Sequence, residues 1–183
     1  ELVAYAKANP GKLNYSTGGI GTLPHLNAEL FKLASGTNIL HVPYKGASES
    51  ATAVIGKQVD FALTISSVAM PHITAGRLVP LAVTGPQRNA RQLNTPTLAE
   101  SGWPGVHVTS FGGLSVPAGT PPPIVKRLSE ALSQALTIPE VRAKLEAQGG
   151  TVAPSTPEEL RKALFAEIGL TEQMMKSAKL EAQ

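Results

Sequence analysis

Apolar positions along the first half of the chain follow two alternating spacings. Short runs rich in apolar, β-branched and aromatic residues are typical of buried strands. The segments between them repeat apolar residues every three or four positions, as one face of a helix does. The strand-like runs cover residues 12–16, 38–44, 59–65 and 78–85, and the helical segments cover 23–33, 47–55 and 68–73. Strands that alternate with helices over short connections predict an α/β fold with a parallel sheet covered on both faces.

The first residues have the pattern of a helix that is already under way. Leu2, Val3 and Ala6 are spaced for one face, and an Asn-Pro-Gly sequence at 9–11 ends the segment. We therefore expect residues 1–12 to be the end of a helix, with further residues before it in the whole protein.

The second half of the chain is organised differently. Residues 96–105 are rich in turn formers, and residues 106–119 have the pattern of an extended crossing segment interrupted by two glycines. Three helices are expected after it. The first follows a run of prolines, the second closes at paired glycines, and the third begins at Thr156, followed by a proline and two acids. The change in pattern predicts one unit at 13–105 and another at 106–183.

The composition narrows the class of protein. Of 183 residues, 42% are hydrophobic and 16% charged, and no apolar run is long enough to cross a bilayer. Cysteine is absent, which excludes disulfides, thiolate metal sites and thiol nucleophiles. The net charge is +3, but the basic residues are scattered and only 4% of residues are aromatic, so nucleic-acid binding is not expected.

Residues 16–22, with the sequence STGGIGT, join the end of a predicted strand to the start of a helix. Open α/β sheets bind their ligands at this position. A helix start has unpaired N–H groups and a partial positive charge, and glycines let an anion approach the backbone. We expect the N–H groups around Gly19 and Thr22 to bind an anion. The alternative is an ordinary glycine-rich turn that packs the strand against the helix.

The motif narrows the kind of anion. A Walker loop needs a lysine before its final Ser or Thr, but Thr22 is preceded by Gly21. A dinucleotide fingerprint starting at Gly19 needs a third glycine where Pro24 stands, and the next strand does not end in an acid. A small carboxylate remains the expected ligand.

Two further strand ends are expected at the same edge of the sheet. Tyr44, Lys45 and Gly46 follow the second strand, and Ser66 and Ser67 follow the third. Because the carboxyl ends of parallel strands meet at one edge, these residues are expected beside the glycine-rich loop. Turn and helix-cap roles are the alternative for all of them.

No catalytic centre, metal site or cofactor is expected. The four histidines show no ligand spacing such as i, i+4, and the chain has no G-x-S-x-G elbow and no Ser/His/Asp order. His25 lies in the first turn after the loop, where the alternatives are contact with a ligand and a packing role.

Four segments, in this order along the chain, resemble the tripartite tricarboxylate transporter substrate-binding proteins, also called Bug proteins. They are YSTGGIGTLPHLNAELFK, HVPYKGASESATAVIGKQVDFAL, PHITAGRLVPLAVTG and PTLAESGWPG. The resemblance implies a periplasmic-binding-protein-like α/β fold with two lobes. It also implies a non-catalytic periplasmic protein that delivers a small organic acid, a mono- or dicarboxylate, to the membrane subunits of a transporter.

The resemblance also implies where the ligand binds. In the family, the loop that matches residues 16–25 holds a carboxylate through N–H groups, hydroxyls and ordered waters. The implied ligand positions are Ser16, Thr17, Gly18, Gly19, Gly21, Thr22 and His25, with Tyr44, Lys45 and Gly46 beside the cleft and Ser66 and Ser67 at its wall. Relatives often carry an aspartate near Thr64, so the contacts at that wall are expected to differ.

On the family pattern, much of the first lobe lies outside this sequence, including its signal peptide and a proline/glycine loop. Residues 13–105 are then expected to form the second lobe, and residues 106–183 to return to the largely missing first lobe. The apolar stripes of the C-terminal helices would be exposed unless they pack together or against a second copy, so a homodimer is one expected state.

The sequence favours an extracytoplasmic solute-binding protein whose two lobes close around a carboxylate. The alternative is the effector-binding domain of a regulator or sensor with a similar two-lobe fold, which an upstream DNA-binding segment would distinguish. An acyl- or phosphate-handling enzyme is disfavoured, because the chain offers no recognisable base and nucleophile.

Overall fold

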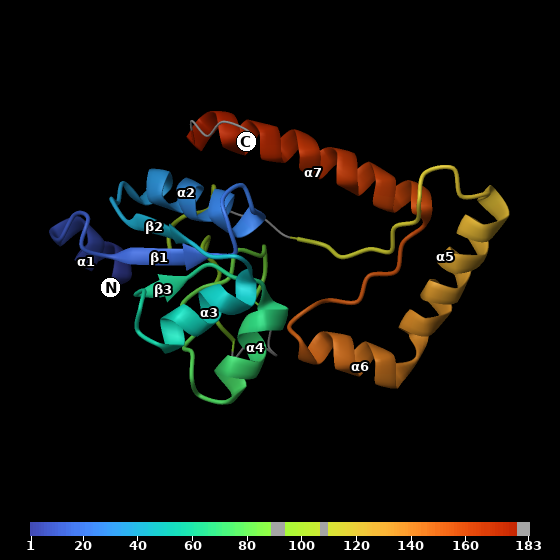
Figure 1. The fold of residues 1–183 in the computed structure, drawn as a ribbon, viewed down its shortest axis with the longest axis horizontal. Coiled ribbons are helices and arrows are strands. Elements are labelled where there is room, and N and C mark those ends of the chain that lie inside the picture. The colour runs from blue at the N-terminus through green and yellow to red at the C-terminus, as the bar shows by residue number, and fades with distance from the viewer. Residues whose placement is uncertain (89–93, 107–109, 179–183) are drawn as a thin grey trace.

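A computed structural model describes residues 1–88, 94–106 and 110–178, and Figure 1 shows its architecture. The sheet has three parallel strands in the order β2-β1-β3. The strands are β1 (Asn14–Thr17), β2 (Leu40–Pro43) and β3 (Phe61–Ala62). Each is followed by a helix, namely α2 (Leu23–Ser35), α3 (Ala47–Ile55) and α4 (Ser66–Thr74). The predicted α/β fold with a parallel sheet is confirmed.

The short helix α1 (Leu2–Ala8) precedes the sheet, as the pattern of the first residues predicts. It ends at Asn9, whose N–H donates to the carbonyl of Tyr5. Ala6 is buried against the sheet, in a cluster with Tyr15, Ala28 and Ile39. The helix therefore adds to the core on the face of the sheet that α2 also covers.

The helices α2 and α3 cover opposite faces of the sheet (Figure 1). Side chains alternate across a strand, so Tyr15 contacts the α2 side while Ser16 contacts Ser50 of α3. The parallel register places His41 of β2 and Phe61 of β3 opposite Tyr15. This register brings the aromatic side chains together under α2.

The prediction of a fourth strand at 78–85 is wrong. The segment makes a single parallel bridge, between Val83 and Thr97, and forms no further ladder within the described part of the chain. Val79 is 79% exposed and Leu81 is also exposed. Apolar alternation produces a strand only where a neighbouring strand offers donors and acceptors, and Pro80 has no N–H of its own to donate.

Three helices follow in the second half, as predicted. They are α5 (Pro122–Thr137), α6 (Pro139–Ala147) and α7 (Pro157–Ala178). The start of α7 is a reciprocal capping box: the Thr156 N–H donates to Glu159 Oε2 at 2.8 Å, and the Glu159 N–H donates to Thr156 Oγ1 at 3.2 Å. None of the described helices is long and apolar enough to cross a membrane.

The C-terminal helices meet the sheet unit mainly through α7. Met174 of α7 is buried against Leu26 of α2, with Leu23, Leu30 and Met175 packed around them. The helices α5 and α6 meet at Ile138, which joins them, and they lie away from the sheet (Figure 1). Many of the large apolar side chains of the three helices are exposed, namely Ile124, Leu128, Leu132, Leu145, Leu164, Phe165, Ile168 and Leu170.

Truncation of Leu26 tests the contact between α2 and α7. We expect Leu26→Ala to lower the free energy of unfolding by about 2–4 kcal/mol, because the side chain is only 1% exposed and its loss leaves a cavity against Met174. The matched control is Leu33→Ala on the same helix, where the side chain is 63% exposed and the expected loss is below about 1 kcal/mol. Urea unfolding followed by circular dichroism measures both, and equal losses would contradict the packing described.

Candidate functional site

The carboxyl edge of the sheet is where three helices begin. The helices α2, α3 and α4 start directly after strands that all point toward this edge, with Thr22, Gly46 and Ile65 as their N-cap residues. None of the three caps makes a side-chain hydrogen bond to its helix. Uncapped helix N-termini present N–H donors and partial positive charge, so this edge favours an anion.

The loop at residues 18–22, which joins β1 to α2, uses part of its donor set internally. The Gly19 N–H donates to Thr17 Oγ1 at 3.3 Å, and the Gly21 N–H donates to His25 Nδ1 at 3.2 Å. The Thr22 N–H makes a longer bond, 3.4 Å, to the carbonyl of Gly19. The N–H groups of Gly19 and Thr22, which we expected to bind an anion, thus have protein acceptors in this structure.

Two other amides of the loop remain available. Among the described residues, no protein acceptor is bonded to the N–H groups of Gly18 and Ile20. These two groups, together with the uncapped start of α2, are the backbone donors that the loop offers to an anion.

The hydroxyls of Ser16, Thr17 and Thr22, at the end of β1 and of the loop that follows it, all bond to protein groups. Ser16 and Thr17 are fully buried. Ser16 Oγ lies 2.8 Å from Ser50 Oγ and bonds the Ser50 carbonyl, which ties β1 to α3. Thr17 Oγ1 lies 2.8 Å from His41 Nε2, and the Thr22 hydroxyl donates to the carbonyl of Gly19 at 2.7 Å. All three hydroxyls thus hold protein groups in place.

The turn after β2 lies directly against the loop. The Tyr44 N–H donates to the carbonyl of Thr17, and a Cβ built on Gly18 would lie 2.8 Å from the backbone nitrogen of Ala47. Only glycine at position 18 allows this close approach. Gly46 has φ +137°, a conformation that side-chain-bearing residues rarely adopt. The structure therefore brings the predicted 44–46 turn and the loop together.

The third strand end contributes less to this arrangement. Ser66 and Ser67 are the first residues of α4 and reach the common edge through β3, with Ser67 exposed. Lys45 is also exposed, and its N–H donates to the carboxylate of Glu49. Thr64 Oγ1 is buried and has no hydrogen-bond partner among the described residues.

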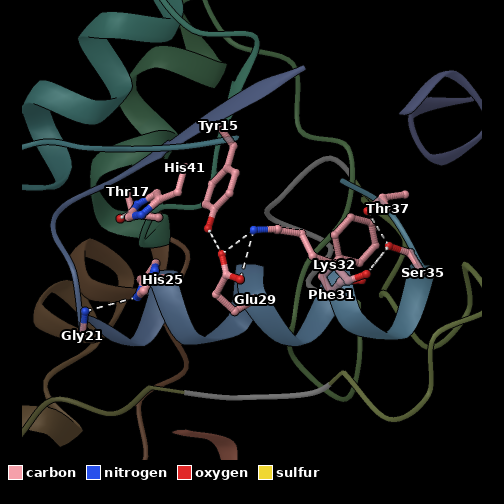
Figure 2. A network of polar contacts seen from close by, with 10 residues as sticks. All are labelled: Tyr15, Thr17, Gly21, His25, Glu29, Phe31, Lys32, Ser35, Thr37 and His41. Atoms are coloured by element: carbon pink, nitrogen blue, oxygen red, sulfur yellow. Dashed lines mark hydrogen bonds and ion pairs between the residues drawn. The ribbon is translucent and has the colours of Figure 1, made fainter. Parts of the chain in front are cut away.

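A network of polar side chains, shown in Figure 2, lies between α2 and the sheet. The rings of Tyr15 and His41 stack with centroids 4.8 Å apart, and those of His41 and His25 stack at 4.3 Å. The Tyr15 hydroxyl donates to Glu29 Oε1 at 2.6 Å, and Lys32 Nζ forms an ion pair with the same oxygen at 2.8 Å. The network joins the loop end of α2 to the middle of the helix.

The protonation states of the network follow from burial and charge. Burial, aided by the charge of a protonated His25, lowers the pKa of His41 to about 4. Burial likewise lowers the pKa of His25. Burial also opposes ionisation of Glu29, but the hydrogen bonds from Lys32 and Tyr15 outweigh it and lower the pKa of that carboxyl. Near neutral pH the network therefore holds two neutral imidazoles beside a Glu–Lys ion pair.

Most of this network was not predicted from the residue pattern. Glu29 lies four residues after His25, and Lys32 lies three residues after Glu29, which places the three side chains together on one side of α2. That spacing was a usable signal. The partnership with His41 and Tyr15 depends on the register of β1 and β2, which the residue pattern does not specify.

Comparison with known families identifies one match over nearly the whole chain. The profile described as "Tripartite tricarboxylate transporter family receptor" matches residues 1–177. A Cupriavidus necator protein named "UPF0065 protein in gbd 5'region" is 41% identical over 145 residues, which are 79% of this chain and 44% of the relative. "Protein BugT" of Bordetella pertussis is 31% identical over 167 residues, 91% of this chain and 51% of BugT. The chain thus spans about half the length of these relatives.

Solved structures share the arrangement of helices and strands. A protein described as a periplasmic transporter matches with a TM-score of 0.93 and 33% identity, over 98% of this chain and 60% of that one. The R. palustris protein Rpa4515 with adipate matches with a TM-score of 0.90 and 33% identity, over 97% and 60%. MatC from Rhodopseudomonas palustris with bound malate matches with a TM-score of 0.76 and 25% identity, over 97% and 59%.

The lowered pKa of His41 predicts a pH-dependent stability. An unfolded histidine binds its proton near pH 6.5, whereas folded His41 does so only near pH 4. Between these values the unfolded state binds more protons, so stability is lost as the pH falls from about 6.5 to about 4. We expect Tm to fall over this window in the wild type and to fall less in His41→Gln, which keeps a donor but cannot titrate. Thermal unfolding followed by circular dichroism measures this, and parallel curves for the two proteins would contradict a neutral His41.

Proposed function

Because the chain belongs to the tripartite tricarboxylate transporter receptor family, we propose that it is the ligand-loop part of a solute-binding receptor. Members of this family are receptors of a transporter and not enzymes. In the proposal, the loop at 18–22 and the start of α2 bind one carboxylate group of a small organic acid, without catalysis. The family match favours this function over an effector domain of a regulator.

The observation that carries the proposal is the convergence of three uncapped helix N-termini at one edge of the sheet. Each helix contributes partial positive charge there, and Gly18 and Ile20 add backbone donors that have no acceptor in the described part of the chain. The described residues also contain no cluster of His, Asp and Glu that could hold a metal ion. Backbone donors are therefore the groups at this edge that suit an anionic oxygen.

The class of ligand is supported by the structural neighbours. Adipate and malate, the acids named with two of them, are both dicarboxylates. Backbone N–H groups recognise a carboxylate group and leave the rest of the acid to other contacts. We therefore propose a mono- or dicarboxylate as the ligand. The proposed partners are the membrane subunits of the transporter, and the proposed location is the periplasm.

The whole receptor is proposed to contain more than the described lobe. Residues 13–105 are assigned to the second lobe and residues 106–183 to a return into the first lobe. Two observations support this assignment: the relatives are about twice as long as the matched chain, and α5, α6 and α7 carry exposed apolar side chains. The residues of the first lobe are the proposed cover for these helices. Ligand binding then closes the two lobes, because the closed state makes contacts that the open state lacks.

A side chain placed over the loop tests the proposed site. Position 21 has φ +77° and no atom within 4 Å of a built Cβ, so Gly21→Val puts a branched side chain in the open space above the loop. The matched control is Gly36→Val at the other end of α2, where φ is +62° and the space is equally open. Both changes impose similar backbone strain.

We expect Gly21→Val to weaken binding of adipate or malate to the full-length receptor at least about tenfold, while Gly36→Val binds like the wild type. Isothermal titration calorimetry measures the affinities, and thermal melts confirm that the two variants lose similar stability. Unchanged affinity in Gly21→Val would exclude the loop as the anchor. A wild type that binds no small carboxylate would contradict the proposed function.

A further inference from the structure

The sequence left two alternatives for His25, contact with a ligand or a packing role, and the structure shows which groups its side chain contacts. Its side chain is only 4% exposed, so it does not project into solvent above the loop. Its Nδ1 accepts the Gly21 N–H at 3.2 Å, and its ring lies against the ring of His41 (Figure 2). An imidazole nitrogen accepts a hydrogen bond only when it carries no proton. The contact therefore requires the tautomer of His25 with its proton on Nε2.

A second imidazole supports the other end of the loop. His41 Nε2 lies 2.8 Å from Thr17 Oγ1, which donates to the carbonyl of Gly19 at 3.2 Å. The Gly19 N–H donates to this hydroxyl at 3.3 Å, so Thr17 connects the Gly19 amide to the ring of His41. The two stacked imidazoles thus hold the N–H groups of Gly19 and Gly21, one through Thr17 and the other directly.

We propose that His25 is the positioning residue of the loop: its Nδ1 turns the Gly21 N–H inward and fixes the backbone so that the N–H groups of Gly18 and Ile20 face the carboxylate. The expected effect of His25 on ligand affinity rests on the proposed function. The contact between His25 and Gly21 is a property of the fold and can be tested without any ligand. In this assignment His25 supports the ligand site without touching the ligand.

A matched pair of variants separates the acceptor from the ring. Asn carries an oxygen and Leu a methyl group at the branch that Nδ1 occupies in histidine, so His25→Asn retains an acceptor while His25→Leu does not. Both variants lose the stack on His41. A further control, His72→Leu, removes a histidine of α4 whose Nδ1 has no hydrogen-bond partner among the described residues.

Two measurements on the full-length protein test the proposal. We expect the Gly21 amide to exchange with deuterium about tenfold faster in His25→Leu than in His25→Asn, since one hydrogen bond is lost. We expect the Kd for adipate or malate to rise about tenfold in His25→Leu and to be partly restored in His25→Asn. His72→Leu should match the wild type in both measurements.

The outcomes are distinguishable. Equal Gly21 exchange in the Asn and Leu variants, or wild-type affinity in His25→Leu, would overturn the positioning role. If the wild type binds neither acid, the proposed function fails for these ligands, and the exchange comparison still decides the role of His25. If the variants do not fold, ¹⁵N NMR of the wild-type imidazole decides it: an unprotonated Nδ1 supports the proposal, and a protonated Nδ1 overturns it.

Discussion

The central position of β1 in the sheet is the constraint on which the rest of the structure depends. Because side chains alternate along a strand, Tyr15 and Thr17 face α2 while Ser16 faces α3. Parallel pairing on both sides places His41 beside Tyr15 and brings the carboxyl ends of all strands to one edge. If β1 paired with its neighbours one residue out of register, Tyr15 would lie on the other face of the sheet and the network would not form. The four residues of β1 thus determine the positions of both the network and the loop.

Burial is the main reason that the two imidazoles under α2 stay neutral, since it lowers the pKa of both His25 and His41. Glu29 is ionised because Lys32 and Tyr15 hydrogen-bond to it, and the positive charge of Lys32 offsets its attraction for protons on the two histidines. A neutral imidazole has one nitrogen that accepts a hydrogen bond, and the Gly21 N–H uses this nitrogen of His25, while His41 hydrogen-bonds the Thr17 hydroxyl. The polar network is therefore part of the support for the loop at the carboxyl edge of the sheet.

The strand–helix alternation, the end of α1 and the capping box at Thr156 were all predictable, because each depends on residues close together in sequence. The position of the loop at the common edge followed from parallel topology. The hydrogen-bond partners of the loop amides could not be predicted. A backbone N–H can bond a protein acceptor or an anion, and the residue types alone do not show that Thr17 and His25 accept from Gly19 and Gly21. The strand predicted at 78–85 did not form, since an apolar alternating run makes a ladder only beside a strand with free donors and acceptors.

The helix α2 is shared by two parts of the molecule. Its first turn closes the glycine loop, while its outer face carries Met174 of α7. The same helix therefore borders the glycine loop at its start and packs against α7 along its length. A substitution at the start of α2 therefore has a structural connection to the packing of α7 as well as to the loop.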